Sequence, residues 1–244
     1  MTLYEYEAEI LAKEYSEVKY LVRKDSHSKA LLEKRDGRRL VALRIKKPFD
    51  IAVYRALTEI ENENLCTVCE VSENDQEYLV LEEFCEGVPL SELVGEKLSE
   101  SEAVFAAMSV ANALYALNSR GIVHRDIKPE NIVISAEKHI KLIDFNISRI
   151  YKDTSSSDTK MLGTIGYAAP EQFGITQSDI RSDIYSVGVL LNMLLVGEHP
   201  VVKMSRNKVI KPVLDRCLKI NPADRYGSAE ELYRELEKIK PKLR

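Results

Sequence analysis

The 244-residue sequence contains no apolar run that approaches the ~20 residues needed to span a bilayer. Its first ten residues alternate acidic and apolar side chains, which is not the pattern of a signal peptide. The formal net charge of −4 gives no electrostatic reason to expect nucleic acid as a partner. We therefore expect a cytoplasmic protein whose partner is neither a membrane nor a nucleic acid.

Cysteine is scarce, with four residues in the chain. Cys66 and Cys69 have the spacing of a metal site, but no second Cys/His pair accompanies them. They lie in a strand-like stretch, where residues three apart point to opposite faces. We therefore expect two separately buried or half-buried thiols rather than a zinc site.

Two short motifs dominate what the sequence does contain. Residues 124–131 read His-Arg-Asp-Ile-Lys-Pro-Glu-Asn, and residues 144–146 read Asp-Phe-Asn after a second apolar run. Phosphoryl transfer needs an acceptor for the attacking hydroxyl's proton, a cation near the moving phosphoryl group, and oxygen ligands for the metal. Groups of these kinds occur, in that order, at Asp126, Lys128, Asn131 and Asp144.

The two motifs resemble the catalytic loop and the Asp-Phe-Gly motif of eukaryotic-type protein kinases. Residues 163–171 are similar to the Gly-Thr-x-x-Tyr-x-Ala-Pro-Glu segment of Ser/Thr kinases, and Lys128 is the residue typical of that class. The chain as a whole resembles small bacterial Ser/Thr kinases. The resemblance implies an α+β, bilobal protein-kinase fold in a single domain spanning residues 1–244. It places a small, mainly antiparallel β lobe at about 1–82, a hinge at about 83–87 and a larger, mainly helical lobe at about 88–244.

The resemblance also implies a function: ATP-dependent transfer of phosphate to Ser/Thr hydroxyls of a protein, with Mg²⁺ or Mn²⁺ as the metal, at a slow rate. The alternatives are a pseudokinase that acts as a nucleotide-binding or scaffolding module, and a kinase-fold enzyme with another acceptor. The implied metal ligands are Asn131 and Asp144. The implied catalytic residues are Asp126, Lys128, Asn131 and Thr164, and the implied nucleotide contacts are Ala30, Ala42, Arg44, Glu83, Cys85 and Val133.

The same resemblance assigns supporting roles in the carboxy-terminal part. Thr164 would bridge Asp126 and Lys128, and Asp183 would steady the catalytic-loop backbone. Glu171 would pair with Arg225. The chain's own polar loop at residues 153–159 is a candidate phosphate acceptor, and phosphorylation there would order the loop through Arg125, unless it is a plain flexible loop.

The amino-terminal part departs from the family. Residues 23–30 contain no glycine where the family has a glycine-rich loop; Arg23, Lys24 and Lys29 there are either phosphate contacts or a solvated hairpin tip. Arg44 replaces the strand lysine that grips the phosphates, with Lys46 as the alternative if the register slips.

The ion-pair partner of that lysine is missing as well. Val53 occupies the position of the helix glutamate. An ungapped match puts Glu82 at the gatekeeper position, where a buried acid needs a partner, and Arg44 is the expected one. A register one residue different would instead put Leu81 in the pocket and Glu82 on the surface.

Hydrophobic periodicity and capping signals predict the elements around these motifs. A capping box at residues 99–102 begins a long helix. Asn146, in place of a glycine, is expected to tolerate left-handed backbone angles. We expect helices at 1–14, from 99 to near 121, from 182, at 212–220 and at 229–239, strands at 18–22, 30–32 and 40–45, and little or no helix between residues 200 and 213.

Overall fold

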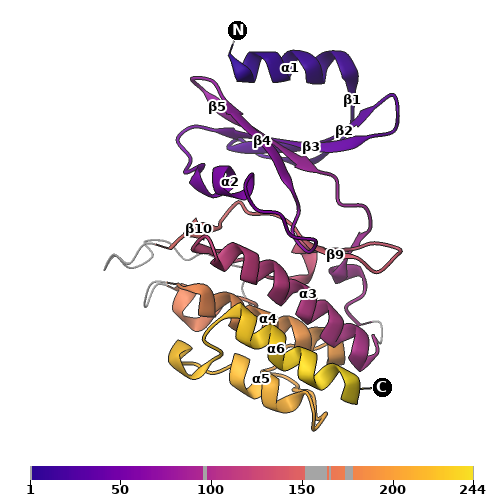
Figure 1. The fold of residues 1–244 in the computed structure, drawn as a ribbon, viewed down its shortest axis with the longest axis vertical. Helices are drawn as coiled ribbons and strands as arrows, with labels where there is room; N and C mark the ends of the chain where they lie inside the picture. The colour runs from indigo at the N-terminus through magenta and orange to yellow at the C-terminus, as the bar shows by residue number, and fades with distance from the viewer. Residues whose placement is uncertain (1, 96–97, 152–163, 165, 174–177, 244) are drawn as a thin grey trace. The chain divides into compact units, whose positions relative to one another are not determined.

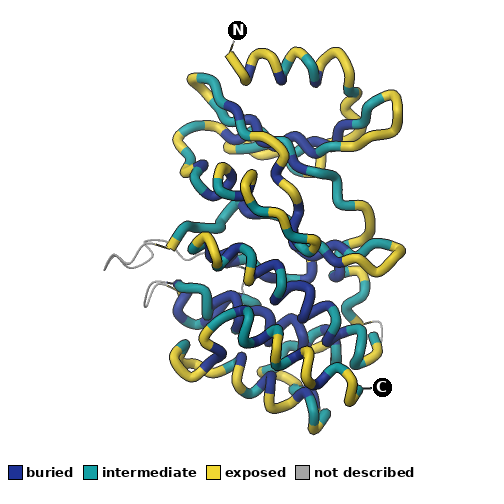
Figure 2. The backbone as a smooth tube through the Cα atoms, in the orientation of Figure 1, coloured by how far each residue is buried: buried dark blue, intermediate teal, exposed yellow. Residues whose placement is uncertain are grey.

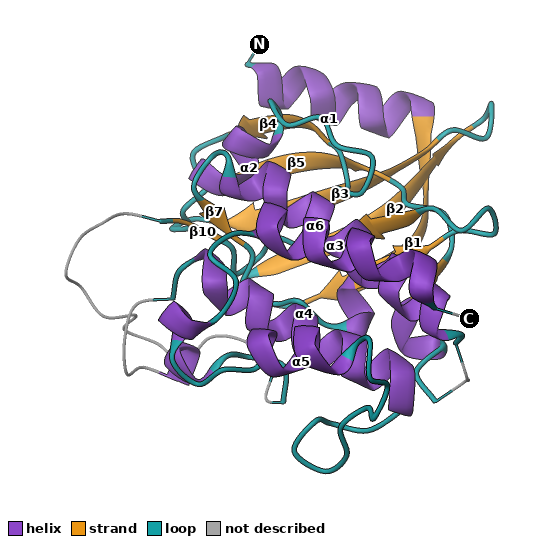
Figure 3. Cartoon of the chain, turned by 60° about the horizontal axis from the view of Figure 1, so that its bottom comes forward, coloured by secondary structure: helices purple, strands orange, loops and turns teal. Residues whose placement is uncertain are grey.

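The computed structural model of the protein describes residues 2–95, 98–151, 164, 166–173 and 178–243. The chain forms two compact units, one of residues 1–61 and 66–85 and the other of residues 62–65 and 86–244. The first unit is built on an antiparallel sheet and the second is mainly helical. Figure 3 draws the strands in orange and the helices in purple. The expected α+β class is therefore confirmed.

The first unit contains one five-stranded sheet in the order β1-β2-β3-β5-β4, and every neighbouring pair is antiparallel. The predicted lead-in helix is present as a slightly shorter helix, and each of the three predicted strands lies within a somewhat longer strand. The elements of this unit are α1 (Leu3–Glu14), β1 (Tyr15–Arg23), β2 (His27–Lys34), β3 (Arg39–Lys46), α2 (Ala52–Leu57), β4 (Val68–Glu73) and β5 (Glu77–Glu83).

Local sequence signals explain where these elements begin and end. Thr2 caps α1 in a reciprocal capping box with Glu5. The turn between β2 and β3 uses Gly37 at a φ of 84°, which a residue with a side chain rarely adopts. The Asp36 carboxylate accepts a hydrogen bond from the Arg38 backbone N–H across that turn, so the Asp-Gly pair closes the hairpin.

The two faces of the sheet are covered differently, since α1 lies on one side and α2 on the other (Figure 1). Tyr4 and Leu11 of α1 pack in one buried cluster with Ala30, Ala42 and Leu79 of the sheet. Residues directly opposite each other in antiparallel strands share a face. Ala42 and the residues opposite it, Ala30 and Leu81, therefore lie under α1. The residues next to Ala42 in the sequence, Val41 and Leu43, point to the other face.

The second unit is organised around two long helices that contact each other, α3 and α4, which carry long buried stretches in Figure 2. Two small sheets, β6-β8-β9 and β10-β7, carry the loops of the candidate site. The elements of this unit are β6 (Val88–Pro89), α3 (Glu100–Asn118), β7 (Ile122–Val123), β8 (Ile132–Ile134), β9 (Ile140–Leu142), β10 (Arg149–Ile150), α4 (Ile180–Val196), α5 (Lys211–Cys217) and α6 (Ala229–Ile239).

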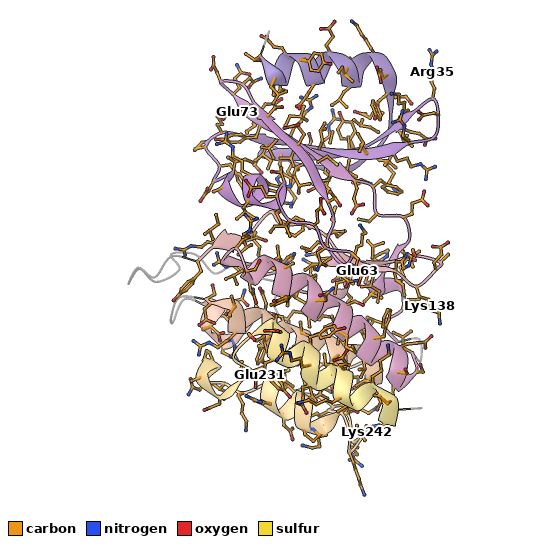
Figure 4. The ribbon with its side chains drawn as sticks, in the orientation of Figure 1. Arg35, Glu63, Glu73, Lys138, Glu231 and Lys242 are labelled. Atoms are coloured by element: carbon orange, nitrogen blue, oxygen red, sulfur yellow. The ribbon has the colours of Figure 1, made fainter. Side chains whose placement is uncertain are left out.

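The predicted start of α3 is confirmed, because Ser99 and Glu102 form the expected capping box. Lys138, labelled in Figure 4 at the β8–β9 turn, places its ammonium 3.0 Å from the Glu102 carboxylate. Hydrogen bonds from Ser99 and Lys138 lower the pKa of Glu102 to about 2. Residues 200–210, all of which are described, form no helix, as expected. Within the described part of the chain, no helix is long and apolar enough to cross a membrane.

Candidate active site

The backbone of the loop between β7 and β8 is held by groups from distant parts of the second unit. The buried Asp183 carboxylate accepts hydrogen bonds from the backbone N–H groups of His124 and Arg125, at 2.8 and 2.7 Å. The Gln172 side chain donates to the Arg125 carbonyl oxygen at 2.9 Å. These bonds stabilise Arg125 at a φ of 73°, a conformation that costs a non-glycine residue about 1–3 kcal/mol. The predicted contact between Asp183 and this loop is confirmed.

The side chain of Asp126 is the centre of a compact hydrogen-bonded cluster. The Thr164 hydroxyl donates to Asp126 Oδ1 at 2.7 Å, and Lys128 Nζ lies 2.7 Å from Oδ2. Lys128 Nζ also donates to the Thr164 hydroxyl at 2.9 Å, so the predicted bridge is present. Asn131 Nδ2 donates to both the Asp126 carboxylate and its backbone carbonyl, each at 2.9 Å. The structure thus brings together all four residues predicted to be catalytic.

The cluster keeps Asp126 ionised. Burial by itself would raise the pKa of Asp126, but hydrogen bonds from Lys128, Thr164 and Asn131 and the charge of Lys128 outweigh burial and lower it. The carboxylate therefore remains an acceptor throughout the neutral pH range.

The two predicted metal ligands lie on adjacent backbone segments, since the Ile143 N–H donates to the Asn131 carbonyl at 2.9 Å. Asn131 turns its amide nitrogen to Asp126, which directs its side-chain oxygen elsewhere. An amide oxygen and a carboxylate are the ligands that a hard cation such as Mg²⁺ prefers. The residues present therefore fit a magnesium or manganese ion.

The turn after Asp144 differs from the expectation in one respect. Asp144 itself takes the left-handed conformation, at a φ of 68°, and Asn146 does not. The Asn146 side chain instead donates to Asp144 Oδ1 at 2.6 Å, and its backbone N–H donates to the same oxygen at 3.3 Å. Asn146 therefore positions the Asp144 carboxylate rather than supplying backbone freedom.

Arg225 and Glu171 form the predicted ion pair in the core of the second unit. The guanidinium binds the carboxylate through two hydrogen bonds, at 2.6 and 2.9 Å, and both side chains are buried. The Ser182 hydroxyl donates to the same carboxylate at 2.8 Å. These contacts hold Glu171, the last residue of the 163–171 segment, against the start of α4.

Ala30, Ala42 and Arg44, predicted to contact the nucleotide, require a correction. All three lie on the face of the sheet that α1 covers. Arg44 donates to the Tyr4 hydroxyl at 2.7 Å and to Glu77 at 3.1 Å. The chain's own helix therefore occupies the space in which the nucleotide was expected to meet these residues. Lys46, the alternative to Arg44, lies exposed at the end of β3.

The predicted pair between Arg44 and Glu82 is wrong. Glu82 is opposite Val41 in the sheet, whereas Arg44 is opposite Leu79, so the two side chains point to opposite faces. Glu82 is buried, as the gatekeeper hypothesis required, but its partner is Lys29, whose Nζ lies 2.7 Å away. Sequence reasoning named Lys29 only as one of three cations in the loop region.

The remaining predicted nucleotide contacts are placed as follows. Val133 is buried in β8 of the second unit, and the Glu83 side chain at the end of β5 accepts from the Thr67 N–H at 2.8 Å. Cys85, Glu83 and the buried Cys66 bring three potential metal-ligand atoms within 4.8 Å of one another. A hydrogen bond with Cys85 and burial raise the pKa of the Cys66 thiol, so it stays protonated. Cys66 and Cys69 are separate free thiols, as expected, but only Cys66 is buried and Cys69 is exposed.

The candidate phosphorylation loop at residues 153–159 lies outside the described residues. The proposed contact between a phosphate there and Arg125 stays a prediction.

Comparison with known proteins identifies the class to which this fold and site belong. Residues 50–243 match the protein kinase domain family, so the chain belongs to that family. The matched region contains the catalytic loop and both predicted metal ligands, and it begins after β3.

The curated relatives that match the chain are bacterial serine/threonine-protein kinases. The chain is 31% identical over 177 residues to the probable serine/threonine-protein kinase PknB of Lactococcus lactis, which covers 67% of this chain and 28% of that protein. It is 33% identical over 214 residues to PknL of Mycobacterium tuberculosis, covering 78% and 54% of the two proteins. A probable serine/threonine-protein kinase of Clostridium perfringens is 30% identical over 210 residues, covering 76% and 31%. The chain thus spans only about a third to a half of the length of these relatives.

Proposed function

We propose that this protein transfers the terminal phosphoryl group of ATP to serine or threonine hydroxyls of a protein substrate. The observation that carries the proposal is the Asp126 carboxylate, bound at once by Lys128, Thr164 and Asn131. A chance acid in a surface turn would not be bound by a lysine and an amide of its own loop and also by a threonine hydroxyl 38 residues further along the chain.

In this proposal Asp126 accepts the proton of the attacking hydroxyl. Its lowered pKa makes it a weak base, so it contributes chiefly by orienting the hydroxyl toward the phosphoryl group. Lys128 holds its ammonium beside the carboxylate as a point charge, suited to balancing negative charge on the transferred group. Thr164 links these two side chains and keeps the carboxylate in one rotamer.

Mg²⁺ or Mn²⁺ would be held by the side-chain oxygen of Asn131 and by Asp144. When bound, the metal supplies positive charge between the phosphates of ATP. Asn146 and the Ile143–Asn131 backbone bond support the two ligands by fixing Asp144 and by joining the two loops.

The acceptor class follows from Lys128 and from residues 163–171, which are similar to Ser/Thr kinases, and from the names of the relatives. The chain's own 153–159 loop is one candidate acceptor. The cytoplasmic location expected from the sequence is part of the same proposal.

The test is a transfer assay with labelled Mg²⁺-ATP and a generic protein substrate. We expect labelled phosphoserine or phosphothreonine with the wild-type protein and very little with Asp126→Asn. Transfer at an unchanged rate by Asp126→Asn would overturn the assignment of Asp126. A folded wild-type protein that binds Mg²⁺-ATP but transfers nothing would instead be a nucleotide-binding scaffold, and label on a non-protein acceptor would indicate a different kinase class.

A further inference from the structure

The strand register of the first unit fixes which side chains share a face of the sheet. Lys29 of β2 is opposite Leu43 of β3, and Leu43 is opposite Val80 of β5. Val41, two residues from Leu43, is opposite Glu82. Because opposed residues and alternate residues point the same way, Lys29 and Glu82 lie on the same face.

The other face is closed by the chain itself. Leu11 and Tyr4 of α1 pack on it, and Tyr4 and Glu77 bind the guanidinium of Arg44. The hollow that remains between α1 and this face has a volume of about 210 Å³. Ligand pockets are usually at least about 300 Å³, so a nucleoside triphosphate would have to displace α1 to bind there.

On the face opposite α1, β2 and β5 present a buried ion pair, and β3 presents no lysine there. The β3 position on this face is Leu43, which is apolar and fully buried. Lys29 Nζ lies 2.7 Å from Glu82 Oε2, with the two side chains 13% and 1% exposed. A carboxylate buried to that extent is costly unless a cation stays close to it. Glu82 therefore holds the Lys29 side chain in one place.

The helix on this face supplies no competing acid. α2 comprises Ala52–Leu57 and contains one charged residue, Arg55. It packs against the edge strand β4, which is separated from β2 by two other strands. Val53, at the position where a glutamate was sought, is buried in this helix. Glu82 is therefore the buried acid that the fold places beside Lys29.

We propose that Lys29 is the cation that contacts the phosphates of ATP, and that Glu82 is its positioning residue. The inference rests on the proposed function. It gives the phosphate contact that the sequence assigned to Arg44 to the pair of Lys29 on β2 and Glu82 on β5. An ammonium on a flexible four-carbon stem suits a phosphate oxygen as a point charge. Lys29 also lies just after the β1–β2 turn at residues 24–26, in the stretch where the sequence lacks glycine.

The test compares the affinities of wild type and variants for Mg²⁺-ATP and for adenosine, by titration calorimetry. Lys29→Met should weaken Mg²⁺-ATP binding by about tenfold or more and change adenosine binding by less than about threefold, because only the phosphates lose a contact. Lys29→Arg keeps the charge and should restore part of the lost affinity. If Lys29 had a purely structural role, its substitution would lower the affinities for Mg²⁺-ATP and for adenosine equally.

Since Lys29→Met leaves Glu82 buried without this cation, that variant can fail to fold. The double variant Lys29→Met/Glu82→Leu removes both charges, and we expect it to fold and show the same selective loss for ATP. Arg44→Met is the matched control, and we expect its ATP affinity to stay within about threefold of wild type.

Two outcomes separate this inference from the proposed function. If wild type binds and uses Mg²⁺-ATP, an unchanged ATP affinity in Lys29→Met and in Lys29→Met/Glu82→Leu, or a selective loss in Arg44→Met, overturns the inference alone. Wild type that binds no Mg²⁺-ATP overturns the inference together with the proposed function.

Discussion

At the scale of single residues, Arg225 illustrates how a buried charge is stabilised. Two of its hydrogen bonds go to Glu171, and the others go to the backbone carbonyls of Lys219, Arg181 and Ile220. All five N–H donors of the guanidinium are therefore used. Removing such a residue strands both a carboxylate and several carbonyl groups.

We predict that Arg225→Met lowers the free energy of unfolding by about 3–5 kcal/mol, because Glu171 is left buried without its counter-charge. Urea denaturation measures the change. Arg234→Met is the control, since its pair with Glu230 is exposed, and it should cost no more than about 0.5 kcal/mol. The double variant Arg225→Met/Glu171→Leu should cost less than the two single changes added together. Additive losses would show that the pair contributes nothing of its own.

A second prediction for a single residue concerns the buried side chain of His124. Burial lowers the pKa of His124 to about 4, from an ordinary value of 6.5. Between these pH values His124 is protonated in the unfolded chain and neutral in the folded protein. The contribution of His124 to the free energy of unfolding should therefore fall by about 3 kcal/mol as the pH drops from 6.5 to 4.

The measurement is urea denaturation of wild type and His124→Phe across that pH range. Other groups titrate too; burial raises the pKa of Asp183 to about 7, with an effect of opposite sign. Only the difference between the two proteins is therefore informative. The variant should lose relatively less stability toward acid, and parallel pH profiles would contradict the prediction.

At the scale of elements, the contact of α4 with α5 depends on Gly188. A Cβ at this position would lie 2.6 Å from the Cβ of Cys217, which is closer than two such atoms approach. Glycine in the middle of a helix costs about 1 kcal/mol relative to alanine. Glycine is nevertheless favourable here because the two helices approach too closely for a side chain at this position.

We predict that Gly188→Ala destabilises the protein by about 1–3 kcal/mol, although alanine is the better helix former. Chemical denaturation measures the loss. Combining it with Cys217→Gly removes the atom it strikes, so the double variant should be more stable than the two separate losses imply. Stabilisation by Gly188→Ala alone would show that the helices can move apart freely.

Sequence reasoning found most elements because their signals are local. The capping box at Ser99 and the Asp36–Gly37 turn each identify a boundary by themselves. The face of the sheet to which each side chain points was harder to predict. Val41, Ala42 and Leu43 are all buried, so β3 shows no alternation that would tell one face from the other.

At the scale of the whole molecule, the two units differ in how many of their side-chain contacts could be predicted from the sequence. In the second unit, Asp126, Lys128 and Asn131 lie within six residues, so the loop that joins them fixes their geometry. In the first unit, Arg44 and Glu82 were paired by charge alone. Their actual partners, Glu77 and Lys29, depend on strand register and on where α1 packs, and neither is a local property.

In the proposed function, Asp126 and Asp144 of the second unit have different tasks in phosphoryl transfer. The most direct measurement follows single-turnover transfer and Mg²⁺-ATP-induced thermal stabilisation in wild type, Asp126→Asn and Asp144→Asn. A bound ligand raises the melting temperature, so binding and transfer are read separately.

We expect wild type to be stabilised by Mg²⁺-ATP and to transfer phosphate. Asp126→Asn should keep the stabilisation and lose about 10²–10⁴-fold in transfer rate, the usual contribution of a positioned acid or base. Asp144→Asn should lose both, since Asp144 is a proposed ligand of the metal. A wild-type rate in Asp126→Asn, or undiminished Mg²⁺-ATP stabilisation in Asp144→Asn, would contradict the account.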